Sequence, residues 1–173
     1  MIQPNNIISK LCNLLSPEFQ NHNNNLEEQQ EKMCVAIKND GVNFLSYSYD
    51  KIIKGETKNL LPFLAKNKDV HSMCDYVLFC EYKKQLFILL IELKKGRKEV
   101  MTQLNAGKCF VDFIISTLNR IEGLNIKPKI RLISIRNNNI VKKGGSRCRC
   151  VQYDKNDFYS FQGKNFFIKE FLF

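Results

Sequence analysis

Two apolar segments around a short polar stretch dominate the middle of the chain. Residues Asp75–Cys80 and Leu86–Leu93 flank the polar stretch Glu81–Gln85. Two apolar runs joined by a tight polar turn are typical of a β-hairpin. Phe87–Ile91 is apolar without alternation, as is typical of a strand that is covered on both faces. The pattern therefore predicts a buried strand pair at the centre of the fold.

Helical patterns occur before and after this hairpin. A short helix is predicted at Ile7–Leu15, and near-helical spacing of apolar residues predicts another over about Leu26–Lys38. The Asn- and Gln-rich residues 20–30 are either a solvated linker or the polar start of that second helix. Apolar residues at intervals of three and four predict a long amphipathic helix over about Lys98–Arg120, which Gly123 ends.

Further strands are predicted on both sides of the hairpin. Val42–Tyr49 alternates in part, and Lys129–Arg136 alternates strictly. Cys148–Tyr153 and Phe166–Phe173 are predicted as late strands, the second with a terminal tail as the alternative. Lys58–Lys66 is predicted as a short helix or loop, because a proline within it limits its length. This order of helices and strands predicts an α/β core.

Size and composition fit one domain. A chain of 173 residues that is 44% hydrophobic and 25% charged favours a single domain with a real core. We expect that domain to span residues 1–173, with the N-terminal helix and polar linker of residues 1–25 as an appendage. No apolar run approaches the ~20 residues that a membrane span needs. Seven cysteines without an export signal predict free thiols in a reducing cytoplasm.

The charge balance favours nucleic acid as a partner. The net charge is +10 and the isoelectric point is near 9.3, which favours binding to polyanions. Two basic clusters add to this preference: Lys94, Lys95, Arg97 and Lys98, and then Lys142, Lys143, Arg147 and Arg149.

The register of the predicted hairpin gives two acidic residues a special position. If the turn centres on Lys83 and Lys84, Asp75 lies directly opposite Glu92, with Cβ atoms only about 5 Å apart. Opposed like charges are unfavourable, and a divalent cation held between them reverses the sign of their interaction. Lys94 lies two residues after Glu92, on the same face of the strand.

The same residues resemble the motif of the PD-(D/E)XK nuclease superfamily. Asp75 is followed 17 residues later by Glu92-Leu93-Lys94, and the matching segment runs from about Asp75 to Arg136. The resemblance implies a restriction-endonuclease-like core, in which a central mixed β-sheet has a helix on each side. It also implies hydrolysis of phosphodiester bonds with Mg²⁺, for which Mn²⁺ would be a substitute, and we expect the substrate to be DNA.

The resemblance assigns roles to individual residues. Asp75 and Glu92 would ligate the metal, and the backbone carbonyl of Leu93 would add a ligand. Lys94 would orient or help to deprotonate the attacking water and would stabilise negative charge at phosphorus. Gln103 matches a glutamine that some branches carry on the helix after the lysine.

Other positions differ from the family pattern or do not show which residue would match it. Many members carry a further glutamate on an upstream helix, for which Glu27, Glu28 and Glu31 are candidates here, with Glu31 preferred. Cys74 stands in place of the motif's proline, which is often missing in the family, and Gly107 stands where one branch has tyrosine. The branch is therefore undecided.

Three alternative functions remain open at this point. One is a catalytically inactive module of the same fold that binds nucleic acid within a larger complex, and another is an RNase with the same site. A third is an interaction protein stapled by zinc, with His71, Cys74, Cys148 and Cys150 as ligands. A domain this small leaves specificity to a homodimer, a partner subunit or an effector-controlled state.

Overall fold

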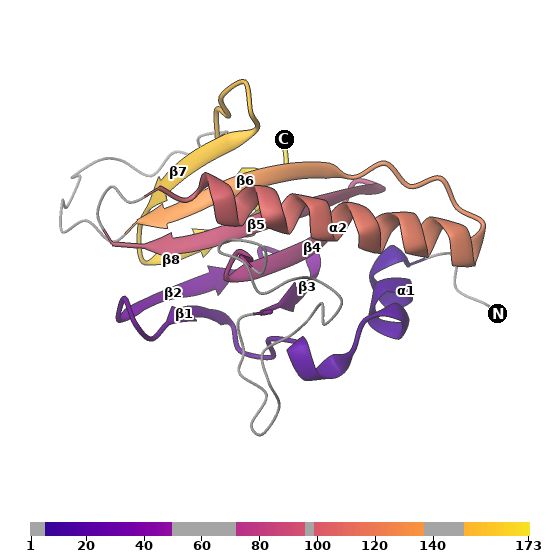
Figure 1. Ribbon diagram of the computed structural model, residues 1–173, viewed down its shortest axis with the longest axis horizontal. Helices are drawn as coiled ribbons and strands as arrows, with labels where there is room; N and C mark the ends of the chain where they lie inside the picture. The colour runs from indigo at the N-terminus through magenta and orange to yellow at the C-terminus, as the bar shows by residue number, and fades with distance from the viewer. Residues whose placement is uncertain (1–5, 50–71, 96–98, 137–150) are drawn as a thin grey trace.

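The computed structural model describes residues 6–49, 72–95, 99–136 and 151–173, which form a mixed α/β structure with two sheets (Figure 1). In chain order the elements are α1 (Ile7–Leu14), a 3-10 turn (Pro17–Phe19), β1 (Asn25–Glu28), β2 (Met33–Lys38), β3 (Asn43–Tyr47), β4 (Tyr76–Tyr82), β5 (Gln85–Lys94), α2 (Met101–Glu122), β6 (Lys129–Arg136), β7 (Phe158–Gln162), β8 (Asn165–Phe167) and a second 3-10 turn (Ile168–Phe171). The predictions for Lys58–Lys66 and for a loop at Asn137–Arg147 lie outside the described residues.

The central sheet has five strands in the order β3-β4-β5-β6-β7. The β3, β4 and β5 strands are antiparallel, whereas β6 and β7 continue the sheet in parallel. The predicted hairpin register is confirmed, since Tyr82 pairs with Gln85 at one end and Tyr76 with Ile91 at the other. Lys83 and Lys84 both adopt positive φ angles, of 49° and 63°. A two-residue turn of this kind follows the twist of the strands and fixes their register.

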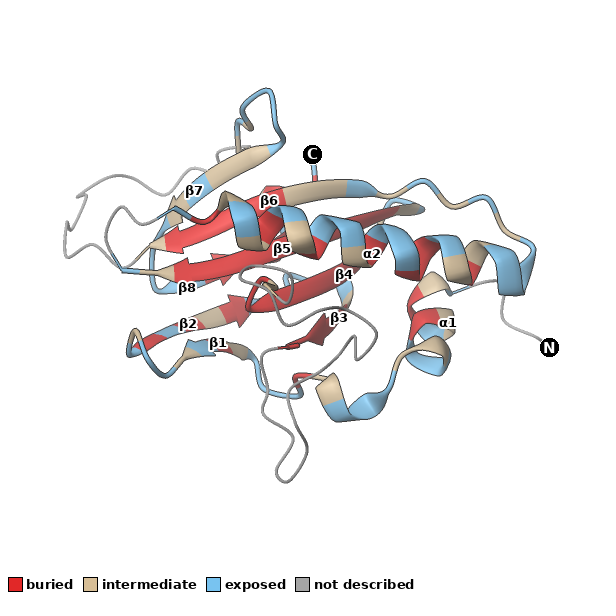
Figure 2. Cartoon of the chain, in the orientation of Figure 1, coloured by how far each residue is buried: buried red, intermediate tan, exposed pale blue. Residues whose placement is uncertain are grey.

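Three layers make up the described part of the fold. Both helices cover one face of the central sheet, and the second sheet, ordered β1-β2-β8, covers the other (Figures 1 and 2). The helix-side core includes Leu11 of α1, Val111 of α2 and Leu90 of β5. The sheet-side core includes Val35 of β2 and Leu89 of β5. In the described residues the expected arrangement with a helix on each face is not found, because a β-sheet covers the second face.

The helix predicted over Leu26–Lys38 is also wrong, because this segment forms the hairpin of β1 and β2. Met33, Val35 and Ile37 are buried in alternation with more exposed neighbours, and this period of two matches a strand. Lys32 adopts a φ angle of 49° in the turn between the strands. The apolar residues fit both periods locally, and packing against the central sheet selects the strand.

The two ends of the chain take part in the core. Leu11 of α1, which we expected to lie in an appendage, is fully buried in the helix-side core. Late strands do occur, but the first is at Phe158–Gln162 rather than Cys148–Tyr153, where the described residues Val151–Tyr153 form no strand. The second, β8, pairs with β2 in parallel. These pairings are distant in sequence, so local patterns do not reveal them.

The long helix α2 connects β5 to β6 and lies along one face of the central sheet (Figure 1). Its predicted extent is nearly correct, and Gly123 ends it in the left-handed conformation, with a φ angle of 62°. None of the helices in the described ranges is long and apolar enough to cross a membrane. Near the start of α2, Gly107 lies so close to Cys74 that a Cβ atom there would be 2.6 Å from the Cys74 Sγ. The helix thus approaches the chain directly before Asp75.

Substituting Gly107 by alanine is expected to destabilise the protein by about 1–3 kcal/mol, because the added methyl overlaps the Cys74 sulfur. A loss of stability is unusual for this substitution, since alanine normally stabilises a helix by about 1 kcal/mol relative to glycine. Urea unfolding of Gly107→Ala measures the effect. In a Cys74→Ala background the same substitution should become neutral or stabilising. A Gly107→Ala protein as stable as the unsubstituted one would contradict this packing.

Candidate functional site

Asp75 and Glu92 face each other at the end of the β4–β5 pair, as the register predicts. The last paired residues are Tyr76 and Ile91, and the acidic residues occupy the next position. The Asp75 backbone N–H donates to Glu92 Oε2 at 3.3 Å, and the Leu93 N–H donates to Asp75 Oδ2 at 2.6 Å. The Glu92 carboxylate therefore accepts a hydrogen bond from the backbone of Asp75, and the Asp75 carboxylate accepts one from the backbone of the residue after Glu92.

Both carboxyl groups are buried. Asp75 is 7% exposed and Glu92 is 1% exposed. Burial raises the pKa of Asp75, and the charge of Glu92 raises it further. Burial also raises the pKa of Glu92, against the opposing effect of Lys94. The pair is thus held in an environment that disfavours two negative charges, and a bound cation would relieve this cost.

Lys94 lies beside the pair, as the sequence predicts. Its Nζ is 3.0 Å from Glu92 Oε1, and its side chain is 22% exposed. Burial alone would lower the pKa of Lys94, but the hydrogen bond and the charge of Glu92 outweigh burial and raise it. The Lys94 side chain is therefore protonated and positively charged, and it contacts both the acidic pair and the solvent.

The upstream glutamates come from the β1–β2 hairpin and not from a helix. The charge of Glu28 contributes to the raised pKa of both carboxyl groups, whereas that of Glu31 acts on the pKa of Lys94. Glu27 anchors the hairpin through its backbone, which both donates to and accepts from the Tyr76 hydroxyl, at 2.8 and 2.9 Å. The charges of Glu28 and Glu31 thus both act on this group of side chains, Glu28 on the two carboxyl groups and Glu31 on Lys94.

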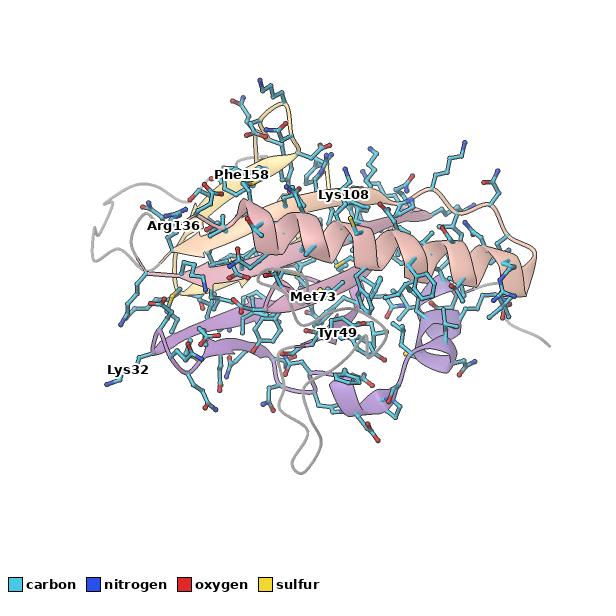
Figure 3. All side chains as sticks on the ribbon, in the orientation of Figure 1. Lys32, Tyr49, Met73, Lys108, Arg136 and Phe158 are labelled. Atoms are coloured by element: carbon cyan, nitrogen blue, oxygen red, sulfur yellow. The ribbon has the colours of Figure 1, made fainter. Side chains whose placement is uncertain are left out.

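The site lies at one end of the molecule. Figure 3 shows Arg136 at the end of β6 and Lys32 in the β1–β2 turn, both at the end where β5 finishes and α2 starts. Lys95 is exposed there. The other basic residues of the two clusters lie outside the described residues: Arg97, Lys98, Lys142, Lys143, Arg147 and Arg149.

Two further polar side chains near this end have buried atoms without a hydrogen-bond partner. The first is Gln103, in the first turn of α2, whose Oε1 is buried and unpaired. The second is Ser134 of β6, which sequence reasoning missed. It is fully buried, pairs in register with Glu92, and has an unpaired Oγ. A serine that follows Ile130 and Leu132 on the same face of the strand is the signal that marks it.

A magnesium ion fits the donor set at this site. Mg²⁺ commonly binds one or two carboxylates and keeps several waters, so the opposed pair is a suitable partner. Within the four described ranges no group of three or more His, Cys, Asp or Glu side chains is arranged to hold a metal. A larger protein cage is therefore not part of the site as described.

The structure gives no zinc ligand set in its described ranges. His71, Cys148 and Cys150 lie outside them. Cys74 is fully buried against α2, and burial raises the pKa of its thiol. The cysteines that the structure describes are all free thiols: Cys12, Cys34, Cys74, Cys80 and Cys109.

The buried pair predicts a specific dependence of stability on pH. Because the pKa of Asp75 is raised on folding, the folded state binds more protons, and stability should fall as pH rises. Between about pH 5 and about pH 8, Asp75→Asn should reduce this fall by about 1–2 kcal/mol. Urea unfolding in EDTA measures it, with Asp112→Asn on the exposed side of α2 as the control. Equal pH profiles for all three proteins would contradict the prediction.

Comparisons with known proteins identify no relative of this chain. No protein-family model, curated protein or solved structure matches it significantly. A functional assignment therefore has to come from the residues and their arrangement.

Proposed function

We propose that this protein is a Mg²⁺-dependent nuclease that hydrolyses phosphodiester bonds in DNA. The observation that carries the proposal is the buried pair of Asp75 and Glu92 with the Lys94 ammonium 3.0 Å from Glu92. Two carboxylates and an ammonium at one strand end are the groups that metal-assisted phosphoryl hydrolysis requires. The net charge of +10 supports a polyanionic substrate, bound mainly through its phosphates.

The order of elements supports a PD-(D/E)XK core. After α1 and the inserted β1–β2 hairpin, three antiparallel strands, a second helix and a parallel strand follow one another as β3, β4, β5, α2 and β6. The acidic residues occupy the expected strand ends within that order. The covering of the second face by β1, β2 and β8 is a departure from the expected core.

Each residue of the site would have its own role in the reaction. Asp75 and Glu92 would hold Mg²⁺, with the backbone carbonyl of Leu93 as a further ligand. When bound, the cation would lower the pKa of a water molecule and neutralise charge on the scissile phosphate. Lys94 orients that water and stabilises the negative charge that develops on the phosphoryl oxygens. The water would give up one proton to solvent as its oxygen bonds to phosphorus, the bond to the leaving oxygen would break, and the leaving oxygen would take a proton from solvent.

A second candidate is a catalytically inactive module that binds nucleic acid. The backbone hydrogen bonds to both carboxylates favour it, because they give the pair a structural role in closing the strand ends. An RNase that uses the same residues is a variant of the main proposal. Specificity in either case would come from a homodimer or a partner subunit.

Incubation with nucleic acids tests the proposal. The purified protein is mixed with plasmid DNA, single-stranded DNA and RNA in Mg²⁺, Mn²⁺ or EDTA. We expect cleavage of DNA in Mg²⁺ or Mn²⁺ and none in EDTA. Cleavage of RNA alone would replace DNA by RNA as the substrate. Binding that weakens with salt, without cleavage of any substrate, would favour the inactive module.

A further inference from the structure

Ser134 has a hydroxyl that the described fold leaves without a partner. It is fully buried, and its Oγ makes no hydrogen bond. Leu90 and Leu132, two residues before Glu92 and Ser134, both belong to the helix-side core. Because side chains alternate along a strand, Glu92 and Ser134 both face α2. The register places them side by side on adjacent strands.

Gln103 of α2 lies over the part of the central sheet that carries Glu92 and Ser134. A Cβ atom at Gly107 would be 3.6 Å from Leu90 Cδ1, so Gly107 sits over Leu90. Since α2 connects two parallel strands, it runs back against their direction (Figure 1). Gln103 is one turn earlier, about 5–6 Å towards the start of the helix. Glu92 is two residues further along β5, about 7 Å in the same direction.

The two unpaired groups have complementary hydrogen-bonding capacities. The Ser134 hydroxyl can donate a hydrogen bond, and the Gln103 carbonyl oxygen, which is buried and unpaired, can accept one. A water molecule offers both an acceptor and a donor, and buried waters typically satisfy such otherwise unpaired groups. Glu92 is the neighbour of Ser134 in the register of the two strands.

We propose that Ser134 and Gln103 hold an ordered water beside Glu92, and that Ser134 is a positioning residue for the water that attacks the phosphate. The second part rests on the proposed nuclease function, whereas the first does not. The unpaired hydroxyl beside Glu92 is thereby explained as half of a water site. Loss of this hydroxyl should disturb the position of the water without removing any charged group from the site.

A high-resolution crystal structure of the metal-free protein tests the water site directly. We expect an ordered water within hydrogen-bond distance of both the Ser134 Oγ and the Gln103 side chain. Ser134→Ala should lack this water, whereas Ser46→Ala should keep it. Ser46 is a matched control, because it is also a buried strand serine but has a partner in Asn21. A direct hydrogen bond from Ser134 to Glu92 or Gln103, with no water between them, would overturn the proposal.

Kinetics test the positioning role separately. Ser134→Ala should lower kcat by about 10- to 100-fold with little change in KM or in unfolding temperature. Gln103→Leu should have a similar effect, and the double variant should lose little more, since both residues act through one water. Fully additive losses would overturn the shared water. If the unsubstituted protein cleaves nothing, the proposed function fails and the crystal structure alone decides on the water.

Discussion

Replacing Asp75 by asparagine is expected to reduce DNA cleavage by at least about 10³-fold while making the metal-free protein more stable. The loss of cleavage follows from the removal of one of two carboxylates that would hold the cation. The gain in stability follows because Asp75 is buried beside Glu92, so that its charge is unfavourable without a cation. Asparagine retains an oxygen that can accept from the Leu93 N–H, so the local fold should persist.

The combination of opposite effects is what identifies a functional site. A carboxylate kept for structure would lose stability on substitution, whereas a carboxylate kept for a ligand gains stability and loses activity. Cleavage rates and urea unfolding in EDTA at about pH 8 measure the two quantities. Asp112→Asn, on the exposed side of α2, should change neither. Full cleavage by Asp75→Asn would exclude the proposed site.

Replacing Lys94 by methionine is expected to lower kcat by about 10²–10³-fold, because the ammonium is the cationic side chain bonded to the pair. Methionine keeps most of the aliphatic length, so the effect reports on charge rather than on packing. Glu92 then loses the partner of its Oε1, which should raise its pKa further and destabilise the metal-free protein at about pH 8.

The neighbouring Lys95 provides the control for this variant. It is exposed, so Lys95→Met should weaken substrate binding modestly and leave kcat unchanged. Single-turnover cleavage at saturating DNA separates the two effects. Equal kcat values for Lys94→Met and the unsubstituted protein would remove Lys94 from the proposed chemistry.

The centre of the fold could be predicted from the sequence because its signals are local. A polar stretch between two apolar runs located the β4–β5 turn, and the positive φ angles of Lys83 and Lys84 fix the register there. The opposition of Asp75 and Glu92 follows from that register. The long helix α2 and the strand β6 were also predicted with nearly correct bounds, since each has a clear apolar period.

The remaining elements depend on contacts between distant parts of the chain. Residues 26–38 fit a helical period loosely, but Met33, Val35 and Ile37 are buried by packing against the central sheet. The late strand β7 pairs with β6, and β8 pairs with β2, neither of which a local pattern shows. The second sheet they help to build replaces the expected helix on that face.

Parts of the candidate site were missed for the same reason. Ser134 becomes notable only when β6 pairs with β5 and places it beside Glu92. Glu28 was one of three upstream candidates, and only the docking of β1 on β4 through the Tyr76 hydroxyl relates it to the acidic pair. Gly107 departs from one family branch, and its contact with Cys74 gives glycine a packing reason at this position.

Titration with Mn²⁺ in a calorimeter at about pH 8 tests most directly whether Asp75 and Glu92 form a cation site. The account predicts saturable binding to the unsubstituted protein, accompanied by an increase in unfolding temperature with Mn²⁺ concentration. Both effects should disappear in Asp75→Asn and in Glu92→Gln, and both should persist in Asp112→Asn. The absence of binding to the unsubstituted protein, or binding that both site variants retain, would contradict the account.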